Sequence, residues 1–200
     1  ISMGVRIGPF IIGSPTAEQE RAVLGAAPTL DFNYHRRKHD AADATSLSFS
    51  LPYTHDVSRT KIGQGRKDYK RARALLNKWE HFNLAWAYTN SPRVAVDAPV
   101  LVTARSLGLW TMNPLRVCKV ESSRNGYSFT HRTLAGHQLS GEERFVLELG
   151  GDGCVWYGVE TVSRPATVVS ALSFPVVRWY QGKFKRDSLR RMQVLVGGCG

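Results

Sequence analysis

The chain has 200 residues, 42% of them hydrophobic and 10% aromatic, which suits one domain with a substantial core and excludes disorder for most of its length. Its apolar runs fall far short of the roughly 18 residues that span a bilayer, so no transmembrane helix is predicted. With 27 lysines and arginines against 16 acidic residues, the net charge of +11 indicates either simple solubility or an anionic partner such as RNA, a lipid headgroup or an acidic protein.

The first thirty residues are rich in glycine, proline and alanine and have no sustained periodicity. We expect an extended N-terminal arm over residues 1–30, held on the body or on a partner, with one helical turn around Thr16–Leu24. Thr16 is a suitable cap for that turn, and Gly25 is a suitable end. Residues 31–60 are polar, and only Ser46–Leu51 alternates enough to predict a short strand there.

The clearest helix is predicted over Asp68–Phe82, because its apolar residues recur at steps of three and four. A short strand is predicted at Asn83–Tyr88. From Arg93 to Ser163 the period changes to two, which predicts an antiparallel meander. Its β-prone runs are Val94–Val96, Pro99–Arg105, Leu115–Glu121, Tyr127–Leu134, Glu142–Leu149 and Val155–Val162. The predicted turns between runs are Ser106–Gly108, Asn113–Pro114, Asn125–Gly126 and Asp152–Gly153.

A long C-terminal helix is predicted to begin at Ser163–Pro165, with Pro165 in its first turn, and to be kinked or restarted at Pro175. One face of this helix is apolar and the remainder is basic. The element order predicts an α+β fold in which a curved antiparallel sheet wraps around the C-terminal helix. Residues 31–196 would form this single domain, followed by a tail at 197–200.

Glu143 is the strongest candidate for a functional side chain. Because side chains alternate along a strand, Glu143 should share the inner face of its strand with Phe145, Leu147 and Leu149. A carboxylate drawn toward a core needs a partner. The candidate partners are His131, His137, Arg105, Arg116 and Arg164. The pair would be either a structural ion pair or a polar anchor or acid/base group at the mouth of a pocket.

Three other sequence patterns each allow a structural and a functional interpretation. The aromatic residues Trp110, Tyr127, Phe129, Trp156, Tyr157 and Trp179 belong either to the core or to the wall of an apolar cavity. Gly63–Gly65 before a helix favours an ordinary turn over a phosphate site, since the dinucleotide fingerprint is incomplete. His35 and His39 have a metal-like spacing, but basic residues lie between them, so we predict no metal and no cofactor.

Several basic residues are dense enough to contact an anionic partner, although charge runs are usually solvated faces. They are Arg36, Arg37, Lys38, Lys70, Arg71, Lys185, Arg186 and Arg190. The aromatic motif of RNA-binding sheets is absent, so RNA or anionic lipid contact is only weakly indicated. The scattered Cys118, Cys154 and Cys199 favour a reducing, intracellular compartment. A first residue other than methionine indicates a trimmed sequence or a removed targeting segment, as for a mitochondrial or plastid protein.

Several segments together resemble a known family. Leu134–Phe145 resembles its T-L-x-G-H-x-x-x-G-E-E-x-F segment, and Val155–Tyr157 followed by Val162–Ala166 resembles its V-W-[YF]…S-R-P-A segment. Ile62–Gly65, Ala74–Trp79 and Asn113–Val117 resemble its loop, first helix and C-R-V strand, with Leu115 where cysteine is usual. This is the uncharacterised protein family zero-five-four-eight, of bacteria and plants, and the resemblance covers Leu30 to Val196.

The family has no established activity, so the resemblance implies a fold and not a reaction. That fold is similar to the helix-grip domains of START lipid-transfer proteins, pollen allergens and polyketide cyclases, which hold apolar or amphipathic ligands between sheet and helix. The predicted function is therefore a non-enzymatic domain with an apolar pocket for a small lipophilic ligand. The alternative is an accessory subunit of a large organellar assembly, held by its basic surface and arm. An acid/base enzyme built on Glu143 ranks last.

The predicted pocket residues are aromatic residues of the predicted sheet together with the polar residues around Glu143. They are Trp110, Tyr127, Phe129, His131, His137, Glu143, Trp156, Tyr157 and Arg164.

Overall fold

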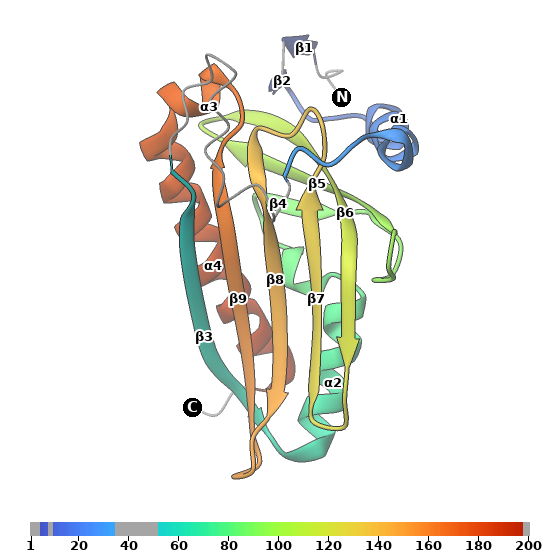
Figure 1. Ribbon diagram of the computed structural model, residues 1–200, viewed down its shortest axis with the longest axis vertical. Coiled ribbons are helices and arrows are strands. Elements are labelled where there is room, and N and C mark those ends of the chain that lie inside the picture. The colour runs from blue at the N-terminus through green and yellow to red at the C-terminus, as the bar shows by residue number, and fades with distance from the viewer. Residues whose placement is uncertain (1–4, 8–9, 35–51, 198–200) are drawn as a thin grey trace.

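The computed structural model describes residues 5–7, 10–34 and 52–197, which form a nine-stranded antiparallel sheet with its two longest helices on the concave face (Figure 1). The strands are β1 Val5–Ile7, β2 Phe10–Ile12, β3 Thr54–Gln64, β4 Ala87–Thr89, β5 Pro99–Ser106, β6 Leu109–Ser122, β7 Gly126–Thr133, β8 Leu139–Leu149 and β9 Cys154–Pro165. The helices are α1 Ala17–Ala26, η1 Ala27–Thr29, α2 Gly65–Asn77, η3 Glu80–Phe82, α3 Val168–Leu172 and α4 Phe174–Val196. The predicted α+β class and the order of helix, meander and long C-terminal helix are confirmed.

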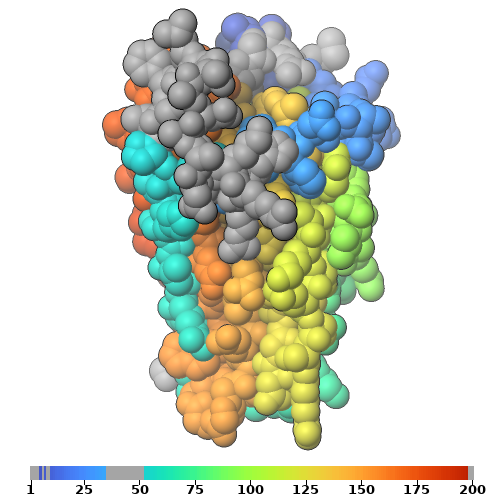
Figure 2. All heavy atoms as spheres, viewed as in Figure 1, coloured from blue at the N-terminus to red at the C-terminus, as the bar shows by residue number. Residues whose placement is uncertain are grey.

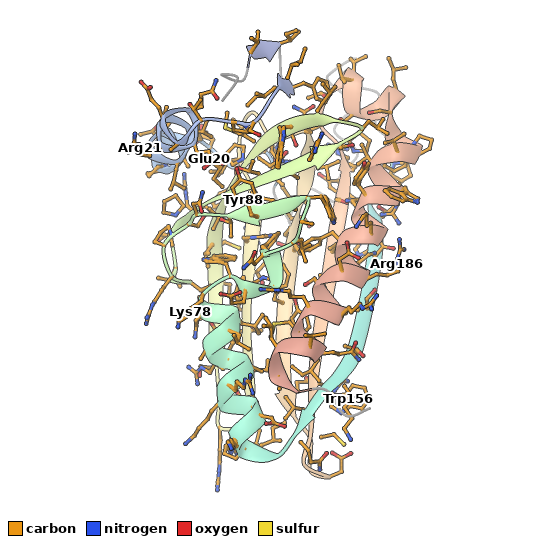
Figure 3. All side chains as sticks on the ribbon, turned by 180° about the vertical axis from the view of Figure 1, so that it is seen from behind. Glu20, Arg21, Lys78, Tyr88, Trp156 and Arg186 are labelled. Carbon is orange, nitrogen blue, oxygen red and sulfur yellow. The ribbon has the colours of Figure 1, made fainter. Side chains whose placement is uncertain are left out.

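The sheet runs in the order β1-β2-β6-β7-β8-β9-β3. On the edge of β6 away from β7, β5 pairs with β6, and β4 pairs with β5. The strands curl into a half-barrel around α4. Seen from behind, α2 and α4 both lie across the concave face of the sheet (Figure 3). Figure 2 shows the opposite face, where the side chains of β3, β9, β8, β7 and β6 lie side by side over the lower half. The predicted wrapping of the sheet around the last helix is therefore confirmed.

Three of the four predicted turns connect strands as expected. At the β5–β6 turn both central residues have positive φ, 50° at Leu107 and 83° at Gly108, the conformation that matches the twist of a hairpin. The turn predicted at Asn113–Pro114 is wrong, because both residues lie inside β6. Pro114 is tolerated there because its backbone carbonyl points away from β5. The carbonyl accepts from Leu134 N–H, just past the end of β7, so the missing N–H of Pro114 is not needed for pairing with β5.

The helix predicted over Asp68–Phe82 is two elements. The α2 helix ends at Asn77, and Trp79 adopts a left-handed conformation (φ 61°) before η3 begins. The strand predicted at Asn83–Tyr88 is the short β4, and Val94–Val96 lies in a loop rather than a strand.

The C-terminal helix does not begin at Pro165, which is the last residue of β9. Thr167 instead caps α3 in a capping box with Ser170. A new helix, α4, then starts with Pro175 in its first turn, where the missing N–H costs nothing. The predicted restart at Pro175 is therefore confirmed, and the predicted start at Pro165 is wrong.

The N-terminal arm docks on the body through a helix that begins as predicted. Thr16 caps α1, which ends at Ala26, one residue past the predicted end. The Glu20 carboxylate accepts hydrogen bonds from Tyr88 Oη at 2.6 Å, Thr103 Oγ1 at 2.9 Å and Asn90 Nδ2 at 2.9 Å. The strand predicted at 46–51 and the two histidines His35 and His39 lie outside the described residues.

The core fills the half of the sheet that α2 covers. Its layers follow the strand register: Phe129, Phe145 and Val159 are paired across β7, β8 and β9, and each is at most 1% exposed. Leu76 of α2 and Met192 of α4 close the layer from the helical side. Toward α3 this packing gives way to a cavity. Across the described ranges, no helix has both the length and the apolar character needed to cross a bilayer.

Candidate functional site

A cavity of about 350 Å³ lies between the concave side of the sheet and the first half of α4. Its walls come from β2, β4 and β5 to β9, from the end of η3, and from α3 and α4. Most of the side chains that face it are apolar or aromatic. The larger ones are Phe10, Phe82, Trp86, Val102, Leu107, Leu109, Leu115, Leu139, Val162, Val169, Val176, Val177, Tyr180 and Phe184.

Polar side chains also line the cavity, and one row of them includes the ionisable residues His131 and Glu143. His131 of β7 pairs in register with Glu143 of β8, and Glu143 pairs with Thr161 of β9. Since the three positions are directly opposite one another, their side chains point to the same face of the sheet, and all three line the cavity. His131 is 1% exposed and Glu143 18%. His131 Nε2 lies 3.1 Å from Glu143 Oε2.

The predicted orientation of Glu143 is therefore confirmed, and its partner is His131 rather than the other candidates. The residues that share its face, Phe145 and Leu147, are fully buried. Arg116, another candidate, instead donates to the carbonyls of Ala27, Pro28 and Leu30. Arg105 lies over Trp110, and Arg164 over the ring of Tyr53.

Hydrogen bonding in this row is incomplete. Within the described part of the chain, the buried atoms His131 Nδ1 and Thr161 Oγ1 have no hydrogen-bond partner. The next row toward the mouth differs, because Thr133 Oγ1 bonds to Gly141 and Ser163 Oγ accepts from Gln181. The row on the other side is apolar. The unmet polar groups are thus concentrated at the base of the cavity.

Two further histidines are held uncharged near this row. His137 lines the cavity, and its Nδ1 accepts from Leu139 N–H at 2.9 Å. Desolvation, reinforced by His131, lowers the pKa of His137 to about 3. Burial also lowers the pKa of His81 well below its usual 6.5, and His131 adds to that shift. His81 is 0% exposed and neither of its ring nitrogens has a partner among the described residues.

Of the nine predicted pocket residues, the cavity is lined by His131, His137 and Glu143. Tyr127, Phe129 and Tyr157 belong to the packed core, which was the alternative prediction for the aromatic residues. The hydroxyl of Tyr127 bonds to Asn77 and that of Tyr157 to Ser188.

The other three lie outside the lining. Trp156 packs under the Arg59 guanidinium, and Trp110 against Tyr88. Arg164 covers Tyr53.

Three important residues in or beside the site were not among the predicted site residues. Thr161 is an unremarkable position in a β-prone run, and its place beside Glu143 depends on the β8–β9 register. Phe82 reaches the cavity because η3 redirects the chain after α2. His81 is buried by the same turn, in contact with the rings of Phe82 and Phe145.

The predicted anionic-partner surface is partly corrected. Lys70, Arg71, Arg186 and Arg190 are exposed on α2 and α4, and Figure 3 shows Arg186 on the outer side of α4. Lys185 is not part of such a surface, because it is 8% exposed and lies 3.3 Å from Asp56.

Arg36, Arg37 and Lys38 lie outside the described residues. Contact with RNA, lipid or an organellar assembly stays a prediction. Over residues 5–7, 10–34 and 52–197, no cluster of histidine, cysteine and acidic side chains is arranged to hold a metal ion.

Solved structures share this architecture at low sequence identity. The Thalictrum flavum norcoclaurine synthase, solved with a transition-state analogue, matches with a TM-score of 0.50 and 10% identity over 74% of this chain and 97% of that one. The di-domain ARO/CYC protein BexL matches with a TM-score of 0.51 and 11% identity, over 74% of this chain and 51% of that one. These likenesses show the helix-grip fold.

Sequence comparison shows the family. A UPF0548 protein of Arabidopsis thaliana is 30% identical over 188 residues, which is 88% of this chain and 92% of that protein. A UPF0548 protein of Dictyostelium discoideum is 33% identical over 159 residues, 71% of this chain and 73% of that one. The model of the domain of unknown function DUF1990 matches residues 39–191. The chain therefore belongs to the DUF1990 family, whose relatives here are UPF0548 proteins, as the sequence motifs predicted.

Proposed function

We propose that this protein binds a small, largely apolar ligand in the cavity between the sheet and α4. The observation that carries the proposal is the cavity itself, about 350 Å³ in volume and bordered mainly by aliphatic and aromatic side chains. This volume lies within the range typical of small-molecule sites, roughly 300–1,000 Å³. Beside the cavity, buried core residues such as Leu76, Phe145 and Met192 pack together, so the cavity borders a closed hydrophobic layer.

The wall that α4 contributes is built to persist without a ligand. Val177, Tyr180 and Phe184 follow one another at helical spacing and face the cavity. Tyr180 Oη accepts a hydrogen bond from Leu107 N–H at 3.0 Å, which ties the helix to the β5–β6 turn. The Trp86 ring contacts Tyr180, and its N–H donates to Asp187 at 2.8 Å. A preformed wall reduces the ordering cost that a ligand would otherwise have to offset.

Burial of apolar surface would supply most of the affinity. An apolar tail placed among Leu115, Val102 and Phe184 leaves water, and each Å² of apolar area removed from water is worth about 25 cal/mol. The fold offers support by analogy only, since norcoclaurine synthase has been solved with a bound transition-state analogue and shares this architecture.

The test measures binding of an uncharged apolar fluorescent probe, such as N-phenyl-1-naphthylamine, to the wild type and to two variants. Ala104 lines the cavity on β5, so Ala104→Phe should fill it and weaken binding at least about 10-fold. Ala74→Phe, on the exposed side of α2, is the matched control and should bind as the wild type does. Thermal melts of all three establish that each is folded. The proposal is overturned if native mass spectrometry finds no co-purified molecule and the wild type binds no apolar probe.

A further inference from the structure

The charges around the cavity are opposite in sign to the charge of the whole protein. The chain carries a net charge of +11, yet among the described residues that line the cavity none is a lysine or an arginine. The acidic residues and histidines of the lining are Glu142, Glu143, His131 and His137. The lowered pKa of His137 leaves that ring neutral at physiological pH. The local field therefore favours a positive ligand group over a negative one.

Of the two carboxylates, Glu143 is the one left for a ligand. Glu142 belongs to the other side of the strand, where Arg132 Nε donates to its Oε2 at 2.9 Å. Glu143 contacts the His131 ring through one oxygen, Oε2. This contact orients the carboxylate through that one oxygen. His131 thus acts as a positioning residue.

The inward-facing cations of α4 are already compensated elsewhere. Arg178 donates to both oxygens of Asp56, at 2.7 Å and 3.0 Å, and Lys185 lies 3.3 Å from the same carboxylate. Asp56 is on β3, on the far side of β9 from Glu143. Consequently no cation from the helix that covers the cavity is committed to Glu143.

We propose that the ligand is an apolar molecule with a protonated amine head, which pairs with Glu143 while its tail lies among the apolar side chains. This inference rests on the proposed binding function and names its ligand class. The ammonium would donate a charge-assisted hydrogen bond to the Glu143 carboxylate. It would also lie beside the Thr161 hydroxyl, which would gain a hydrogen-bond partner that it lacks among the described residues. A fatty acid or another anionic amphiphile would instead place its charge against Glu143 in a poorly solvated space.

Three probes with the same chain and different heads separate the outcomes: decylamine, decanol and decanoate, titrated below their micellar concentrations at pH 7. Calorimetry of the wild type should show decylamine binding at least about 10-fold tighter than decanoate, with decanol between them. The net positive charge of the protein would by itself favour decanoate, so this order cannot come from the overall field.

The variant Glu143→Gln keeps the shape and the hydrogen bond to His131 but removes the charge. It should weaken decylamine about 10-fold or more and leave decanol nearly unchanged. Glu160→Gln, on β9 with its side chain on the convex face near Arg144, is the matched control and should leave the order intact.

Equal or tighter binding of decanoate by the wild type would overturn the amine assignment while leaving the proposed function standing. Tight amine binding that survives Glu143→Gln would overturn the role of Glu143. Failure of all three probes to bind would count against the proposed function itself. The wild-type order alone decides the amine assignment if Glu143→Gln does not fold.

Discussion

Glu143 and His131 stand opposite each other across β7 and β8, with their side chains joined at 3.1 Å on the concave face of the sheet. The pair lies at the boundary between the packed core, which begins at Phe145, and the open cavity. An ionisable pair at this position separates two environments: a dry layer in which further polar groups would be costly, and a space in which a ligand can meet the carboxylate.

The pair should be energetically coupled. His131→Leu leaves a largely buried carboxylate without its donor and should destabilise the fold by about 1–3 kcal/mol. In Glu143→Leu/His131→Leu the charge and its partner leave together, so the double variant should be more stable than the sum of the single effects by about 1–2 kcal/mol. Urea denaturation of the four proteins measures this coupling. Additive effects within a few tenths of a kcal/mol would show that the contact contributes nothing to stability.

His81 should make the protein sensitive to acid. Because burial lowers the pKa of His81 and of His137, both remain neutral in the folded state, while unfolded histidines bind protons near pH 6.5. As the pH falls below that value the unfolded state binds more protons, and each histidine removes about 1.4 kcal/mol of stability per pH unit until its folded pKa is reached.

His81→Leu tests this account. The substitution replaces two unpartnered ring nitrogens by an apolar side chain of similar size, so the free energy of unfolding at pH 7 should be unchanged or higher. Between about pH 6 and pH 4 the stability of the variant should fall less steeply than that of the wild type. The difference in slope should correspond to the uptake of about one fewer proton on unfolding. Denaturant titrations across this range give both slopes, and parallel slopes would contradict the neutral state of His81.

Asp56 should stabilise the contact between β3 and α4. Its carboxylate accepts from Arg178 and lies beside Lys185, and the hydrogen bond from Arg178 is the main cause of its lowered pKa. Asp56→Asn leaves Lys185 largely buried without a counter-charge and should cost about 1–3 kcal/mol. In the wild type this stabilisation is present above the ordinary carboxyl pKa and is lost as the pH falls through the lowered one.

Glu148→Gln is the comparison for Asp56→Asn. Glu148 pairs with Arg59 at 2.7 Å, but both side chains are 50% exposed, so the substitution should change stability by no more than about 0.5 kcal/mol. Thermal or urea unfolding of both variants at pH 7 measures the difference. Equal effects from the two substitutions would contradict the role of the Asp56 network.

Sequence patterns predicted the parts of this molecule that depend on local periodicity. Alternation along β8 placed Glu143 on the face of Phe145, and paired strands then brought it within reach of His131. The β3 strand was missed because its inner positions are polar: Asp56 meets Arg178, and Thr60 accepts from Gln193 of α4. No hydrophobic alternation marks such a strand.

The cavity was expected from the fold, but its lining required the structure. Which side chains border it depends on how β5, β9 and α4 meet, and these elements are far apart in the sequence. Lys185 shows the same limit, because its burial follows from Asp56, which lies in the strand that the pattern missed. Similarly, Tyr157 shares its strand with Thr161 and yet belongs to the core, since the packing of Ser188 against it closes that layer.

Gly141 should be the most demanding glycine near the site. It lies between Thr133 and Ser163 in the row next to Glu143, and its N–H donates to Thr133 Oγ1 at 2.9 Å. A Cβ added there would overlap the backbone carbonyl of Val162 and come within 2.9 Å of Ser163 Cα, neither of which can turn aside as a side chain can.

Gly141→Ala should therefore force β8 and β9 apart and destabilise the fold by roughly 2–4 kcal/mol, at the upper end of overpacking costs. Gly25→Ala is the matched control, because a Cβ at that helical position meets nothing within 4 Å. Alanine is the better helix former, so this change should stabilise the protein by about 0.5–1 kcal/mol. Opposite shifts in the thermal midpoints of the two variants would support the close approach of β8 to β9 beside the Glu143 row, and a harmless Gly141→Ala would show that the sheet there can open to admit a side chain.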